Sequence, residues 1–211
     1  MAKTLKAVAV PGSLTRAFVL AGILCWWTAG ALAQTPIPTL FSTGVDDTGM
    51  VLPDRAKDPH YELIVSPDLI DAGPEAWVVF SNFFPIPPWL ANGPDSTWIA
   101  PNWNQRAGDA EGDYTYRTTF DLTGFNPSTV NIVGQWAADN QALDILINGV
   151  STGITHVNNP TGNAFVALDS FVLPGGMYVA GSNTLDFVVH NLPASFNPTG
   201  FRVELSGTAS P

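Results

Sequence analysis

The sequence predicts an all-β fold, a two-sheet antiparallel β-sandwich of the jelly-roll type. After residue 34, almost no stretch shows the three- and four-residue apolar spacing of a helix without an intervening Gly or Pro. Short runs rich in β-branched and aromatic residues recur instead, each bounded by Gly, Pro, Asn or Asp. Several of these runs alternate apolar and polar residues, as antiparallel sheets with one solvated face do. About nine such strands in one chain of this size are typical of a two-sheet sandwich.

Nine strands are expected. In chain order they cover residues 61–65, 76–80, 97–100, 114–122, 129–136, 143–147, 165–173, 184–191 and 201–206. Alternation is clearest in 114–122, where every second residue from Tyr114 to Leu122 is apolar or a threonine, so one face is expected to point into the core. Asn148–Gly149 directly follows the strand 143–147 and is a strong hairpin signal, since both residues tolerate positive φ.

The stretch 83–104 differs from the strands because prolines interrupt it. They are Pro85, Pro87, Pro88, Pro94 and Pro101. Proline donates no backbone hydrogen bond, so regular ladder pairing is prevented over most of the stretch. Because the stretch also holds three tryptophans, we expect an ordered surface loop.

The first 33 residues are expected to be a signal peptide. Lys3, Lys6 and Arg16 supply its charge, an apolar run covers 17–27, and residues 31–33 have the A-x-A form of a cleavage site. A membrane-spanning helix needs roughly 20 apolar residues, so no stable membrane insertion is expected after cleavage. The expected location is secreted, periplasmic or at the cell surface. The expected organisation is a signal peptide at 1–33, a short linker at 34–39 and a single β-sandwich domain at 40–211.

Charge and cysteine content exclude several classes of function. The lone cysteine, Cys25, lies in the expected leader, so the mature chain has no thiol for disulfides, thiolate catalysis or zinc. All 18 acidic residues but only five of the eight Lys and Arg residues follow residue 33, which leaves a net charge of −13. This charge argues against nucleic acid and anionic membranes as partners, because phosphates are bound through Lys and Arg. Carbohydrate or an extracellular protein is expected instead.

Four pieces of the chain, in this order and spacing, carry a resemblance to a known type of domain. They are 116–120 (YRTTF), 136–140 (WAADN), Asn148–Gly149 and 181–185 (GSNTL). Over about half its length, the chain resembles the galactose-binding-like jelly rolls of the carbohydrate-binding-module type. Such domains form the accessory sandwich of beta-galactosidases and occur in exported bacterial proteins with a PEP-CTERM sorting tail. The resemblance implies a non-catalytic domain that binds carbohydrate.

The resemblance also implies a structural calcium ion near the N-terminal loop and the last strand. Asp46, Asp47 and Glu204 fall in comparable places. Oxygen ligands in a negatively charged chain suit this ion. The segment 46–49 is equally compatible with plain turn chemistry, so both interpretations stay open. A thermal midpoint that a chelator leaves unchanged would remove the calcium hypothesis.

Two groups of residues are candidates for ligand binding. Trp89, Trp98 and Trp103 could form a platform for a sugar ring, with Asn104 as a hydrogen-bond partner. The alternative is that these indoles fold inward and fix the proline-rich loop to the sandwich. Asp139–Asn140 could meet sugar hydroxyls at the end of a strand, or could satisfy backbone donors in a turn.

No catalytic site is expected. Hydrolysis of a glycosidic bond needs two carboxyl groups across a cleft, and no acidic pair has a spacing that argues for one. The histidines are not spaced as metal ligands, and no serine lies in a nucleophile elbow. Two hypotheses remain. The chain is an exported module that recognises carbohydrate through surface loops, or it is an extracellular structural or matrix protein that mediates protein contacts without a small ligand.

Overall fold

The computed structural model describes residues 33–156 and 163–211. The signal peptide expected at 1–33 lies outside the described residues except for Ala33, so it stays a prediction. In the described part, no helix is both long and apolar enough to span a membrane.

Eleven strands and two short 3-10 helices make up the regular structure of the described residues. The strands are β1 (Thr35–Pro36), β2 (Lys57–Val65), β3 (Glu75–Val78), β4 (Ile99–Ala100), β5 (Gly112–Asp121), β6 (Asn131–Asp139), β7 (Gln141–Ile147), β8 (Val150–Ser151), β9 (Asp169–Val172), β10 (Ser182–Asn191) and β11 (Gly200–Ala209). The 3-10 helices are Gln105–Ala107 and Pro127–Thr129. Each of the nine expected strands overlaps an observed strand, which confirms the all-β prediction.

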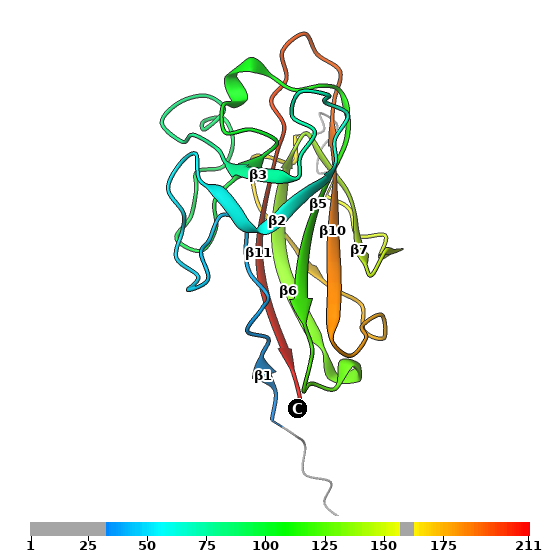
Figure 1. The fold of residues 1–211 in the computed structure, drawn as a ribbon. Coiled ribbons are helices and arrows are strands. Elements are labelled where there is room, and N and C mark those ends of the chain that lie inside the picture. Colours follow the sequence, from blue (N-terminus) through cyan, green and yellow to red (C-terminus); the bar gives the residue numbers. More distant parts are fainter. Residues whose placement is uncertain (1–32, 157–162) are drawn as a thin grey trace, which may run out of the picture. The chain divides into compact units, whose positions relative to one another are not determined.

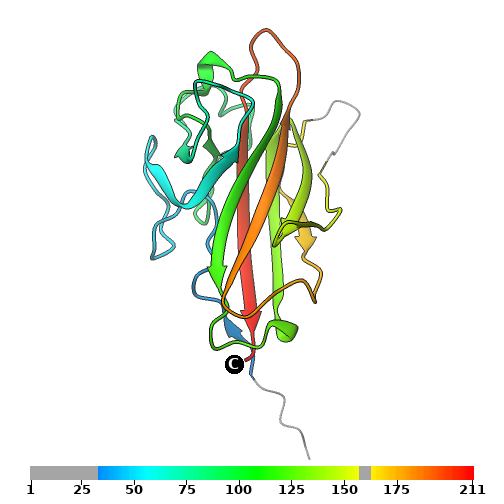
Figure 2. The same cartoon turned by 45° about the vertical axis from the view of Figure 1, so that its right-hand side comes forward.

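The strands form two facing layers. All pairs are antiparallel, and their order is β8-β7-β10-β5-β2-β3-β4-β11-β6-β9, with β1 beside β11. Strands β2, β5, β10 and β7 form one layer, and β11, β6 and β9 form the other (Figures 1 and 2). The short β3 and β4 connect the layers along one edge, so the hydrogen-bonded ladder runs round the fold without a break. The predicted antiparallel β-sandwich is confirmed.

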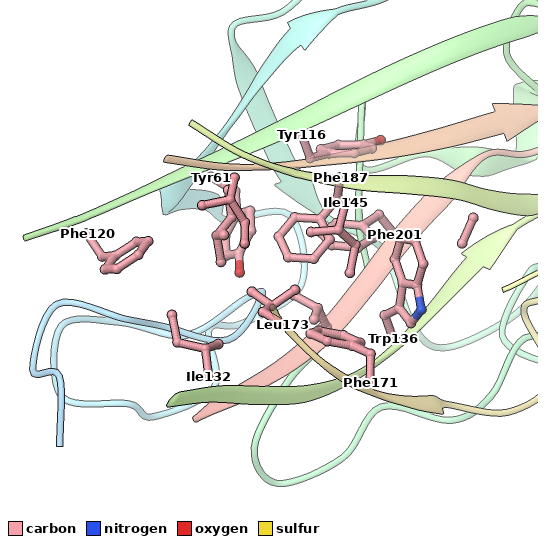
Figure 3. Packing of buried hydrophobic residues seen from close by; sticks show 14 of the residues in the cluster. Tyr61, Tyr116, Phe120, Ile132, Trp136, Ile145, Phe171, Leu173, Phe187 and Phe201 are labelled. Atoms are coloured by element: carbon pink, nitrogen blue, oxygen red, sulfur yellow. The ribbon is translucent and has the colours of Figure 1, made fainter. Parts of the chain in front are cut away.

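The core lies between the layers, where aromatic side chains from both meet (Figure 3). Tyr116 of β5 stacks on Phe201 of β11 with ring centroids 5.3 Å apart, and Phe187 of β10 lies 4.8 Å from the same ring. The predicted inward face of β5 is confirmed, because five alternate residues are at most 1% exposed: Tyr114, Tyr116, Thr118, Phe120 and Leu122.

Two short strands lie outside the predicted set. β1 pairs with the end of β11, and Ile37 directly after it is buried in the core. Residues 34–39, expected as a linker, therefore belong to the sandwich. β8 pairs with β7 through the Asn148–Gly149 turn, where both residues have positive φ, as the sequence predicts.

The proline-rich stretch 83–104 covers part of the outer face of β6 and β11. Four of its residues form a second apolar cluster with two residues from outside the stretch, Val79 and Ala137. The four are Ile86, Trp89, Trp98 and Ala100. Ala137 follows the core residue Trp136 on β6 and so faces the opposite side of the layer. Because Ala137 is small, the indoles of Trp89 and Trp98 can pack closely there, with ring centroids 4.5 Å apart.

Candidate functional site

A pocket of about 270 Å³ lies where β6 ends, beneath the proline-rich loop. Three segments far apart in sequence supply most of its wall: the loop 83–104, the end of β6, and the connection between β10 and β11. The lining residues are Phe84, Pro88, Trp89, Asp139, Asn140, Asn163, Phe165, Phe196, Asn197 and Pro198. The sequence analysis singled out three of these, Trp89, Asp139 and Asn140.

Asp139 is the buried acid of this pocket. Its side chain is 2% exposed, and the Trp89 indole Nε1–H donates to its Oδ2 at 2.7 Å. Its other oxygen, Oδ1, is buried and accepts no hydrogen bond. Burial raises the pKa of Asp139 to about 7, against the opposing effect of the hydrogen bond from Trp89. Asp139 therefore lines the pocket and has one carboxyl oxygen without a hydrogen-bond partner.

Asn140 fixes one wall rather than offering its oxygen to a ligand. Its Oδ1 accepts from the backbone N–H of Leu192 at 2.8 Å and from Asn197 Nδ2 at 2.6 Å. Asn197 Nδ2 also donates to Asn191 Oδ1 and to the carbonyl of Leu192. This network ties the β10–β11 connection to the end of β6, so the side of the pocket opposite the proline-rich loop is held in place.

Two phenylalanines that the sequence analysis did not single out form the rim. Phe84 is 39% exposed and Phe196 is 48% exposed, and their ring centroids lie 5.9 Å apart at an interplanar angle of 31°. Each is next to a proline or one residue away from it, in Phe84–Pro85 and in Phe196–Asn197–Pro198. An aromatic residue beside a proline in a loop is the sequence signal that could have identified them.

The three expected tryptophans do not form an exposed platform. Trp98 is fully buried and donates from Nε1 to the carbonyl of Leu90, and Trp89 is 3% exposed. Trp103 is half-buried, with the guanidinium of Arg55 4.4 Å from its ring centroid. Neither Trp89 nor Trp98 presents a free ring face, so the inward alternative describes both. Asn104, their expected partner, is exposed and lies outside the pocket lining.

Gly200 keeps Trp89 in position over Asp139. It pairs with Asp139 in the β6–β11 ladder, and a Cβ at position 200 would lie 2.5 Å from Cη2 of Trp89. Because an indole cannot bend away, we expect Gly200→Ala to lower the free energy of unfolding by about 1–3 kcal/mol. Urea denaturation measures this loss. Gly175→Ala is the matched control, since nothing lies within 4 Å of its added Cβ. Equal stability of the two variants would contradict the packing described.

A larger groove, of about 710 Å³, lies over the outer face of β9, β6 and β11. Two acidic residues line it, Asp95 and Glu204. The oxygens of Glu204 already accept from Gln135 Nε2 at 2.6 Å and from Ser96 and Arg202 at 3.0 Å each. Burial raises the pKa of Glu204, but these hydrogen bonds and the charge of Arg202 outweigh it and leave the pKa lowered. Because the oxygens of Glu204 are occupied, whereas Asp139 has a buried oxygen without a partner, the smaller pocket is the better candidate site.

The three residues expected to hold calcium are not brought together. Asp46 Oδ1 accepts from the N–H and hydroxyl of Thr48 and from the N–H of Met50, which closes a turn. Asp47 is exposed and lies 3.4 Å from His60. Glu204 belongs to the groove described above. These residues do not fit a calcium site, and the turn interpretation holds for the segment 46–49.

Three other carboxylates do lie close together in the described part of the chain. Oxygens of Asp68, Asp71 and Asp109 are all within 4.8 Å of one another. Asn102 Nδ2 donates to Asp71 at 2.8 Å and to Asp109 at 3.1 Å. Burial, together with the charges of the two neighbouring acids, raises the pKa of Asp109 to about 7. Retention of a proton on Asp109 and the bridging amide of Asn102 both reduce the repulsion within this group.

Comparisons with known proteins give a similarity to a solved structure. The chain is similar to the CBM36-1 domain of a multidomain xylanase from the hindgut metagenome of Trinervitermes trinervoides, with a TM-score of 0.31 and 13% sequence identity, over 47% of this chain and 73% of that chain. No family model and no curated protein matches the chain. The all-β architecture described above fits the galactose-binding-like type of domain that the sequence resembles.

Proposed function

We propose that this chain is an exported, non-catalytic module that binds carbohydrate in the pocket at the end of β6. One observation carries the proposal. Asp139 lines a pocket with two exposed aromatic rings on its rim, and its Oδ1 is a buried acceptor without a partner. Apolar walls with a few convergent polar groups are the general form of a small-ligand site.

A sugar unit matches both parts of this arrangement. Its hydroxyl groups donate hydrogen bonds of the kind that Asp139 Oδ1 lacks. Its C–H faces are apolar and pack on aromatic rings such as those of Phe84 and Phe196. A volume of about 270 Å³ lies just below the range of pockets that hold drug-sized ligands, so it suits one sugar unit of a longer chain.

The surroundings of Asp139 support binding rather than hydrolysis. A glycosidase needs a second carboxyl group facing the first across the bond that is cleaved. The pKa of Asp139 is set by burial and by Trp89 alone, with no contribution from another ionised group. Asp139 is also the one acid among the lining residues of the pocket.

Affinity electrophoresis in gels that contain neutral polysaccharides tests the proposal. We expect at least one polysaccharide to retard the wild-type protein. The double variant Phe84→Ala/Phe196→Ala should bind that polysaccharide at least tenfold more weakly, because both rim rings are lost. Val150→Ala is the control, since Val150 is 58% exposed on β8 and does not line the pocket. Retardation that the double variant leaves unchanged would refute the location of the site. Free migration in every gel would favour a structural or matrix role instead.

Export is tested separately by the mass of the protein released from cells. We expect the released chain to begin at Gln34, because residues 31–33 have the A-x-A form that a signal peptidase recognises. Replacement of Ala31 and Ala33 with phenylalanine should leave the leader attached, and intact mass spectrometry distinguishes the two products. A released chain that still begins at Met1 would contradict the proposal of a cleaved leader.

A further inference from the structure

Asp139 differs from the other buried acids in how its charge is compensated. Three acidic residues in the described part are buried: Asp58, Asp139 and Asp186. Asp186 accepts two hydrogen bonds from Arg117, at 2.6 and 2.8 Å. Asp58 accepts from three backbone N–H groups. Asp139 has the single neutral donor of Trp89 and no cation. An ionised carboxylate is costly to bury without such partners.

The missing partner can be supplied from the pocket, because Asp139 lines it. A hydroxyl group would give Oδ1 a hydrogen bond but no positive charge. A protonated primary amine supplies both, with three N–H donors on a compact cation. Of the chemical groups that a sugar carries, the ammonium of an amino sugar therefore compensates Asp139 most completely.

The rest of the lining also favours a cation. No Lys, Arg or His is among the lining residues, so nothing there repels a positive charge. The faces of Phe84 and Phe196 are exposed at the rim, and aromatic faces attract cations. Three amides line the pocket, and Asp139 Oδ1 accepts a hydrogen bond from none of them. Two of the three, Asn140 and Asn197, bond to each other.

We infer that the pocket selects a sugar unit that packs against the rings of Phe84 and Phe196 and carries a protonated primary amine, which donates to Asp139 Oδ1. The polysaccharide class is one with free amino groups, such as a β-1,4-linked glucosamine chain. This inference rests on the proposed function, because it names the ligand class of the same pocket.

Calorimetric titration with three matched oligosaccharides tests the inference, at pH 7 and about 0.15 M salt, where long-range attraction between charges is screened. The probes are β-1,4-linked oligomers of glucosamine, N-acetylglucosamine and glucose. We expect glucosamine to bind at least tenfold more tightly than the other two. Asp139→Asn should abolish this preference, because the amide still accepts from Trp89 but has no charge. Glu111→Gln removes one exposed charge that is not part of the pocket and should keep the preference.

The possible outcomes separate the inference from the proposed function. Equal affinity for all three oligomers would overturn the inference and leave carbohydrate binding in place. A preference that Asp139→Asn keeps would also overturn it, because the amine would then be attracted by the acidic surface in general. If none of the three oligomers binds but other polysaccharides still retard the protein in gels, the inference is overturned and the proposed function stands. Failure with every polysaccharide would remove both.

A second measurement needs no variant. The carboxyl ¹³C signal of Asp139 in the wild-type protein reports its titration, and Asp139 is the one titratable group among the lining residues. A bound ammonium favours the ionised carboxylate, so saturation with the glucosamine oligomer should lower the pKa of Asp139 from about 7 by at least one unit. The glucose oligomer should not produce this decrease. An unchanged pKa with bound glucosamine would overturn the inference.

Discussion

Replacement of Arg202 with methionine is expected to lower the free energy of unfolding by about 3–5 kcal/mol, the usual cost when one partner of a buried ion pair is removed. Arg202 is 2% exposed on β11 and fixes the proline-rich loop to the sheet. Its Nε donates to Ser96 Oγ at 2.7 Å, its Nη1 to the carbonyl of Ala91 at 2.6 Å, and its Nη2 to Glu204 Oε1 at 3.0 Å. Methionine removes all three of these donors and the positive charge beside Glu204.

The same substitution should also weaken ligand binding, because the loop that Arg202 holds carries Phe84 and Trp89. Urea denaturation measures the stability, and affinity electrophoresis measures the binding. Arg106→Met is the control: Arg106 is exposed, and its guanidinium lies 4.6 Å from the ring centroid of Phe83. Its loss should cost about 1 kcal/mol or less. A similar small cost for Arg202→Met would show that the loop does not depend on this anchor.

Asp139→Asn is expected to raise the free energy of unfolding relative to the wild type, and to raise it more at pH 8 than at pH 4. Burial raises the pKa of Asp139 in the folded wild type to about 7, whereas the ordinary pKa of an aspartic acid side chain is 3.8. The folded state therefore binds more protons than the unfolded state between pH 4 and pH 7, and wild-type stability falls as the pH rises through this window. A difference of about three units corresponds to at most about 4 kcal/mol. Asparagine does not titrate, so the variant lacks this loss.

Urea denaturation of both proteins from pH 4 to pH 8 measures the difference. Asp109 has a similarly raised pKa, but it is present in both proteins, so its contribution cancels when the two are subtracted. The stability gained by Asp139→Asn should grow as the pH rises from 4 to 7 and then level off. If the unfolding free energies of the two proteins change with pH in parallel, the carboxylate of Asp139 is solvated in the folded protein or its charge is already balanced there.

The fold could be predicted because its signals are local. Alternation with a period of two is visible in several of the long strands, most clearly in β5, and turn residues mark the strand ends. β1 and β8 have two residues each, too few to show a period. Trp77 and Trp136 both lie in strand patterns, yet Trp136 is in the core while Trp77 is half-buried beneath Lys57 Nζ, 5.1 Å from its ring centroid. Which face of a short strand is buried depends on what packs against it.

The site was only partly predictable because its properties depend on distant partners. Asp139 and Asn140 were identified as a pair at the end of a strand. The burial of Asp139, however, depends on Trp89, fifty positions earlier in the chain. Trp89 and Trp98 turn inward because Ala137 gives the outer face of β6 an apolar surface, which the sequence of the loop does not reveal. Charge and spacing alone could not show that Asp46 accepts the hydrogen bonds of its own turn, or that Glu204 accepts from the distant Ser96 and Gln135.

A crystal structure with a bound oligosaccharide tests the central claim most directly. We predict a sugar ring packed against Phe84 and Phe196, with a donor of that ring within hydrogen-bond distance of Asp139 Oδ1. An oligosaccharide that lies instead along the groove over β9, β6 and β11, with the pocket beside Asp139 unoccupied, would contradict the claim.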